Sequence, residues 1–183
     1  MIPKLFISVF FFLTFFGSPM QASEPIPYNV IARNLMKKTL ERLQKRHCLH
    51  HGGVNGEMMG CVKLMGLEFH LSRAMDKDEA RAMLIDCVQE FLEDINKDQT
   101  IRKYLQVYPF DTEHIEITIF MRTPEEGTLY YPDFSVVTAR RGKIMYYAKD
   151  QEKEFGHKTK EEESFEDAVK IVQSQNPPQT LPE

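Results

Sequence analysis

Two segments decide the fold: LEFHLSRAMDKDEARAMLIDCVQEFLEDIN, residues 67–96, and IEITIFMR, residues 115–122. The start of the first segment and all of the second alternate apolar and polar residues, which is the period of a half-buried strand. Between these strands, apolar residues recur at helical spacing and predict a long helix over about 77–96. Asp76 followed by Glu79 is a capping-box-like start for that helix. We therefore expect a sheet whose apolar face is covered by the helix.

The predicted fold class is α+β, with a small and mainly antiparallel sheet of three to four strands under the long helix. These strands are expected at about residues 63–72, 114–122, 129–140 and 143–149. An N-terminal amphipathic helix over 29–47 and a C-terminal helix capped by Ser164 complete the prediction. The expected organisation is a signal peptide (1–22), a basic amphipathic helix with a Gly-rich loop (23–60), an α+β core (61–149), and an acidic segment with the C-terminal helix and a disordered tail (150–183).

The beginning of the chain is typical of an export signal. Lys4 precedes the apolar run Leu5–Phe16, and Ala22 offers a small residue for cleavage. The run has 12 residues, fewer than the ~20 of a transmembrane helix, although an uncleaved membrane anchor is the alternative. Cleavage after Ala22 removes Lys4 and no acid, so the formal net charge changes from -4 to -5. We expect export to a periplasm or to the exterior, and this charge does not favour nucleic-acid binding.

Charge is distributed unequally along the mature chain. The helix over 29–47 carries six basic residues against the single acid Glu41, whereas the stretch from Asp150 to Asp167 carries eight acids against three lysines. We predict that the basic helix lies near acidic surface of its own chain, either the Asp86–Asp94 face of the long helix or the segment after Asp150. The alternative is a peripheral contact between helix 29–47 and an anionic membrane.

A group of potential metal ligands lies close together in the sequence: His47, Cys48, His50, His51 and Cys61. Such side chains could hold zinc or copper, but their spacing matches no zinc-finger pattern. The stretch HGGVNGEMMG, residues 51–60, has four glycines and predicts an irregular loop. Because export permits oxidation and this loop could bend back, we favour a Cys48–Cys61 disulfide. Cys87 lies in phase with the apolar helix positions and is expected to be a buried thiol.

Two further groups have both a functional and a structural interpretation. The acidic face of helix 77–96 offers paired carboxylates for acid/base or metal chemistry, or it is simply a solvated face. Aromatic residues on the strands and connections could stack a ligand, or they pack the core. These aromatic residues are Tyr104, Tyr108, Phe110, Tyr130, Tyr131, Phe134, Tyr146 and Tyr147.

No G-x-S-x-G, H-E-x-x-H or C-x-x-C motif occurs in the sequence, and no cofactor is indicated. The leading hypothesis is an exported, non-enzymatic binding module whose partner is a protein or an envelope component. The alternative is a small exported enzyme or metal-binding protein that uses the His–Cys group or the acidic face of helix 77–96. A deep pocket with converging histidines and carboxylates would favour the alternative, and an exposed patch would favour the binding module.

Overall fold

The computed structural model describes residues 27–153 and 156–175 of the 183-residue chain. The predicted leader, residues 1–22, and the predicted tail after residue 175 lie outside the described residues. None of the helices in the described ranges combines the length and the apolar character that crossing a membrane requires. In chain order the elements are α1 (Tyr28–His47), β1 (His50–Glu57), β2 (Leu64–Leu71), α2 (Lys77–Lys97), α3 (Gln99–Arg102), β3 (Ile115–Met121), β4 (Val136–Arg140), β5 (Lys143–Lys149), β6 (His157–Ser164) and α4 (Phe165–Gln175).

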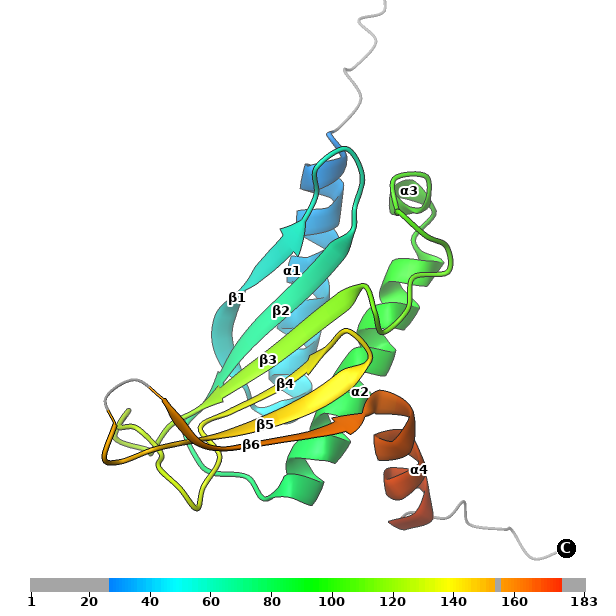
Figure 1. Cartoon of the computed structure of the whole chain (residues 1–183). Coiled ribbons are helices and arrows are strands. Elements are labelled where there is room, and N and C mark those ends of the chain that lie inside the picture. Colours follow the sequence, from blue (N-terminus) through cyan, green and yellow to red (C-terminus); the bar gives the residue numbers. More distant parts are fainter. Residues whose placement is uncertain (1–26, 154–155, 176–183) are drawn as a thin grey trace, which may run out of the picture.

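The six strands form one mixed sheet in the order β1-β2-β3-β4-β5-β6 (Figure 1). Neighbouring strands are antiparallel except β2 and β3, which run parallel. The connection through α2 returns the chain to the end of the sheet at which β2 begins, so β3 starts at that same end. α1 contacts β1 and β2, α2 contacts β3 and β4, and α4 contacts β5, β6 and α2. Figure 1 shows these helices behind the sheet, so one face of the sheet is covered and the other faces the viewer.

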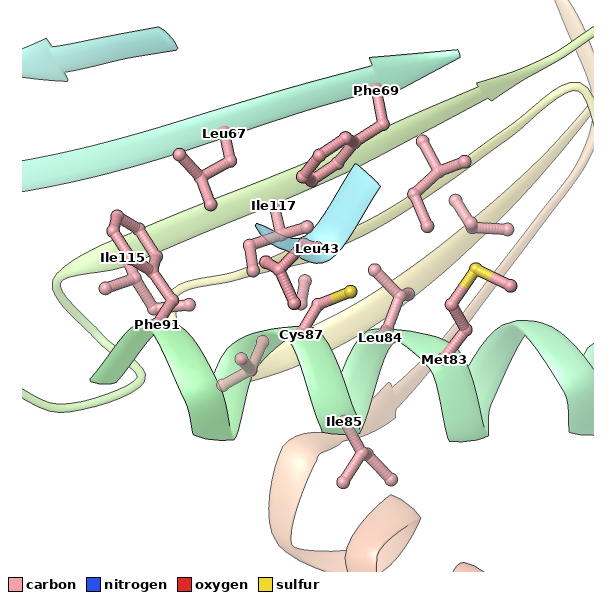
Figure 2. Close-up of a cluster of buried hydrophobic side chains, with 14 of the residues drawn as sticks. Leu43, Leu67, Phe69, Met83, Leu84, Ile85, Cys87, Phe91, Ile115 and Ile117 are labelled. Carbon is pink, nitrogen blue, oxygen red and sulfur yellow. The ribbon is translucent and has the colours of Figure 1, made fainter. Parts of the chain in front are cut away.

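The core lies between the sheet and α1 and α2 (Figure 2). Phe69 of β2 and Ile117 of β3 point from the sheet toward Leu84, Cys87 and Phe91 of α2, and all five side chains are fully buried. The Asp76 carboxylate accepts a 2.8 Å hydrogen bond from the backbone N–H of Glu79, which confirms the predicted start of the long helix. Cys87 is a buried free thiol, as predicted.

A buried ion pair joins α2 to the far edge of the sheet. The Arg81 guanidinium donates to both carboxylate oxygens of Glu163 on β6, at 2.8 and 3.2 Å. The Tyr146 hydroxyl of β5 donates to the same carboxylate, and Asp78 accepts from Arg81. Burial raises the pKa of Tyr146, so its hydroxyl keeps the proton that it donates. This network fixes α2, β5 and β6 relative to one another.

The prediction of a three- to four-stranded, mainly antiparallel sheet under one long helix is wrong. The sheet has six strands, one of its strand pairs is parallel, and four helices accompany it within the described residues. The four expected strands all exist, but the third begins at Val136 instead of about residue 129, because the chain around Pro132 is irregular. The two strands that were not expected, β1 and β6, are the two edges of the sheet.

β1 occupies most of the stretch that was predicted to be a Gly-rich loop. Its glycines are needed for close approach to β2 and not for bending. A Cβ atom on Gly52 would lie 2.4 Å from the carbonyl oxygen of Glu68, and one on Gly56 would lie 2.6 Å from that of Leu64. The glycines therefore allow β1 to pair with β2, with a bulge between His51 and Gly53.

β6 lies in the stretch that was predicted only as an acidic segment, with no strand assigned to it. Its charged side chains are instead paired on both faces of the sheet. Lys77 of α2 binds Glu161 at 2.7 Å on the helix side, and Lys143 of β5 binds Glu162 at 3.1 Å on the other side. Charged side chains on an edge strand also oppose pairing with other chains, which accounts for a strand with so little apolar character.

Candidate functional site

The basic face of α1 lies against the acidic face of α2, as the charge distribution predicted. Arg42 binds Glu90 at 3.0 Å and also pairs with Asp94. One turn later, Arg46 binds Asp86 at 3.2 Å and also pairs with Glu90. These pairs explain why carboxylates are tolerated one turn apart on α2, where they would otherwise repel.

The hollow between these helices has a volume of about 540 Å³ and is lined by the same arginines and carboxylates, with Gln89 and Glu93. Its carboxylates Asp86, Glu90 and Asp94 already accept from Arg42 or Arg46. A general acid or base needs a carboxyl group whose oxygens are free to face a substrate, whereas these three carboxylates are each held by an arginine of α1. The acidic face of helix 77–96 is therefore best explained as the surface that holds α1.

The five predicted metal ligands do not come together as one set. His47, Cys48 and His50 line one hollow, but His51 and Cys61 are not among its lining residues. The imidazole of His47 binds Asp86 at 2.8 Å, while His50 and His51 begin β1 and Cys61 follows its far end. Within residues 27–153 and 156–175, no group of three His, Cys, Asp or Glu side chains has the arrangement of a metal site.

The predicted Cys48–Cys61 disulfide is contradicted by the position of β1. All three cysteines, each of them in the described part of the chain, are free thiols. Cys48 precedes the eight-residue strand and Cys61 follows it, so the strand separates them by roughly 25 Å. A disulfide requires Cα atoms within about 7 Å, which would remove β1 from the sheet.

The predicted aromatic group is divided among four places. Tyr104 and Tyr108 lie around α3, Phe110 and Tyr146 are buried, and Tyr147 lies on the uncovered face of the sheet. Tyr130, Tyr131 and Phe134 belong to the connection between β3 and β4. No single aromatic site exists in the form that the sequence suggested, and most of these rings have separate packing roles.

The uncovered sheet face carries a set of side chains that we name the aromatic row: His70, Phe120, Val136 and Tyr147. They come from β2, β3, β4 and β5, and each lies opposite the next in the strand register. All four are half-buried, although none of the helices in the described part of the chain covers them. The rings of His70 and Phe120 are 5.5 Å apart between centroids, and Tyr147 lies 4.7 Å from the ring of His157 on β6.

Beside the aromatic row, the same face carries a polar layer. The Thr118 and Thr138 hydroxyls are 2.9 Å apart, and these residues are only 7% and 8% exposed. Ion pairs surround them: Arg140 with Glu116 at 3.2 Å and Lys143 with Glu162 at 3.1 Å. Asn55 of β1 donates to Glu68 at 2.7 Å. The face thus has an apolar strip and a charged rim with both signs.

One atom of the aromatic row is unsatisfied. The Nδ1 atom of His70 is buried and has no hydrogen-bond partner within the described residues. Buried polar atoms are nearly always paired because leaving them unpaired costs free energy. Because this atom is inaccessible from outside the chain, His70 contributes to the aromatic row through its ring, which lies against Phe120.

The aromatic row escaped the sequence analysis because it is assembled from four strands whose order was not known. A signal was present in β3, where Phe120 occupies a position that the apolar–polar alternation assigns to the solvent side. A large aromatic residue at a solvent-side position of a strand indicates that this face is covered by another element or serves as a contact surface.

Comparisons with protein-family models, with curated proteins and with solved structures found no match to this chain.

Proposed function

We propose that this protein is an exported, non-enzymatic binding module of the cell envelope or exterior, and that it binds a protein partner on the uncovered face of its sheet. The observation that carries the proposal is the aromatic row, on a face that the helices within residues 27–153 and 156–175 leave uncovered. The export signal predicted from residues 1–22 supports the location.

The chemistry of the face favours a protein over a small ligand. Protein interfaces have an apolar, aromatic centre and a polar rim, whereas small-molecule sites are concave pockets. Phe120, Val136 and Tyr147 supply such a centre, and the ion pairs of Arg140 and Lys143 supply the rim.

The test is site-specific photo-crosslinking in the cells that make the protein. A photoreactive amino acid is placed at Val136 or Met145 on the uncovered face, and in a matched control at Gln173 on α4. We expect a discrete crosslinked product from the two sheet positions and none from position 173. A product with twice the mass of the chain would identify the partner as a second copy.

Two substitutions sharpen this test. Phe120→Ser should abolish the crosslinked product, because it removes the centre of the aromatic row. His70→Phe is the conservative change, because it keeps a ring beside Phe120, and it should leave the product in place. Equal crosslinking from the sheet face and from α4, or a product unchanged by Phe120→Ser, would refute the proposed surface. Circular dichroism and urea unfolding verify that each variant is folded.

A further inference from the structure

Three segments meet at the end of the molecule where α1 begins, at the top of Figure 1. They are residues 28–31, 57–63 and 102–108, and we name them together the tip. The Tyr28 hydroxyl donates to the carbonyl oxygen of Met58 at 2.7 Å. The backbone of Val62 exchanges hydrogen bonds with Tyr104 and Gln106 at 2.8 and 2.9 Å. The tip is therefore one connected surface and not three independent loops.

Apolar side chains are exposed at the tip. Met59 is 85% exposed, Tyr108 48% and Val30 42%, and these are three of the four large hydrophobic residues exposed in the described part of the chain. Beside them, the half-buried rings of Tyr28 and Tyr104 stack with 5.4 Å between centroids. Exposed apolar residues that gather in one place, next to partly buried aromatic rings, mark an interaction surface.

The charges at the tip are mainly positive. Lys63, Arg102 and Lys103 are exposed, and Glu57 is the only acid in the three segments. The Arg102 guanidinium lies 4.3 Å from the ring centroid of Tyr108, and the Lys103 ammonium lies 4.9 Å from that of Tyr104. Tyrosine rings are enriched at membrane–water interfaces, where they lie at headgroup level, and lysines and arginines close to the surface are attracted to anionic lipid.

The position of the tip in the chain points to the same partner. Residues 17–27, eleven in number, separate the apolar run Leu5–Phe16 from the start of α1. Fully extended, they span roughly 40 Å. Whenever that run is inserted in a bilayer, during export or afterwards, the tip is held within this distance of the membrane surface.

We propose that the tip docks on an anionic membrane surface, with Met59, Tyr108 and Val30 entering the headgroup region and Lys63, Arg102 and Lys103 binding lipid phosphates. This contact is independent of the aromatic row, which lies on the face of the sheet. It also differs from the contact through helix 29–47 that the sequence suggested, because Arg42 and Arg46 of that helix are paired with α2.

The test is co-flotation with lipid vesicles of the chain that begins at Ser23. This chain keeps the whole core, since the buried cluster extends from Ala32 to Ala168, and it lacks the apolar run that would bind lipid by itself. We expect binding to vesicles that contain phosphatidylglycerol and much weaker binding to pure phosphatidylcholine. Arg102→Gln with Lys103→Gln should weaken binding by roughly fivefold for each cation removed, and Met59→Ser with Tyr108→Ser should weaken it as well.

Two controls distinguish binding through the tip from nonspecific adsorption of the protein to lipid. Tyr131→Ser removes an exposed ring, 55% exposed, at the opposite end of the sheet and should leave binding unchanged. The triple change Lys37→Gln, Lys38→Gln and Lys45→Gln removes exposed charge from α1 and should weaken binding less than the change at Arg102 and Lys103. The proposal is overturned by equal affinity for both lipids or by no affinity for either. It is also overturned if the α1 lysine variant loses more vesicle binding than the variant changed at Arg102 and Lys103.

Discussion

At the scale of single residues, burial decides the chemistry of the three cysteines. Cys87 is fully buried under the sheet, and this burial, reinforced by the nearby Asp86 and Glu90 carboxylates, raises the pKa of its thiol. Cys48, which follows α1 in a left-handed backbone conformation, is exposed. Because only the thiolate is nucleophilic, the two sites should differ strongly in reactivity.

We therefore expect an alkylating reagent to modify Cys48 in the native protein and to leave Cys87 unmodified until the protein is unfolded. Mass spectrometry of the peptides, with denatured protein as the control, measures both sites in one sample. Rapid modification of native Cys87 would contradict its place in the core, and a Cys48–Cys61 crosslinked peptide would contradict β1.

A second residue, Asp98, caps α3, and the hydrogen bonds of this cap lower the pKa of its carboxyl group. Burial alone would raise the pKa of its carboxyl group, but hydrogen bonds from the Thr100 hydroxyl and from the backbone N–H groups of Thr100 and Ile101 outweigh burial and lower the pKa. A folded-state pKa below the unfolded value stabilises the fold above the unfolded pKa, and this contribution is lost as pH falls through the folded pKa.

Asp98→Ala should thus lower the free energy of unfolding by about 1 kcal/mol near neutral pH. The difference from the parent protein should shrink as the pH falls below about 4, where the carboxyl group of the unfolded chain takes up a proton, and it should disappear only below the lower folded-state pKa. Gln99→Ala, at the exposed neighbouring position, is the matched control and should cost much less. A difference that is independent of pH would show that the carboxylate is not the stabilising group.

At the scale of elements, the sequence predicts those with a clear hydrophobic period and misses those without one. The long helix was expected at about 77–96 and is found at Lys77–Lys97, because its apolar positions and its Asp76 cap are both local signals. β1 and β6 have no such signal. The glycines at 52 and 56 are required because the backbone of β2 lies so close to them. The half-buried carboxylate of Glu163 is accommodated because Arg81 of α2 pairs with it. These partners are distant in sequence, so local patterns cannot reveal them.

The buried face of α2 gives a direct test of this layer. Leu84→Ala and Phe91→Ala remove side chains that are fully buried between α2 and the sheet, and each should lower the free energy of unfolding by roughly 2–5 kcal/mol. Gln89→Ala, on the exposed side of the same helix, should change it by less than about 0.5 kcal/mol. Urea unfolding followed by circular dichroism gives all three values. Small losses at both buried positions would show that α2 does not cover the sheet.

At the scale of the whole molecule, the proposed function depends on an asymmetry between the two faces of one sheet. α1, α2 and α4 all lie on one side, and the ion pairs of α1 with α2 and of Arg81 with Glu163 hold them there. The other side carries the aromatic row, half-buried by its own neighbours and with the Nδ1 atom of His70 unpaired. Sequence reasoning found the charges that place α1 but not this face, because the row exists only once β2 to β5 are aligned.

The most direct test of this asymmetry compares two adjacent valines of β4. Val136 lies on the uncovered face, whereas Val137 is fully buried beneath the helices. Each is changed to cysteine in a background in which Cys48 and Cys61 are serine, and labelling by a thiol reagent is measured in dilute purified protein and in intact cells. We predict that Val136→Cys is labelled readily when purified and is protected in cells, where a partner covers it, while Val137→Cys stays unlabelled in both. Equal labelling of Val136→Cys in the two settings, or its protection in the purified protein, would contradict a free sheet face that binds a partner.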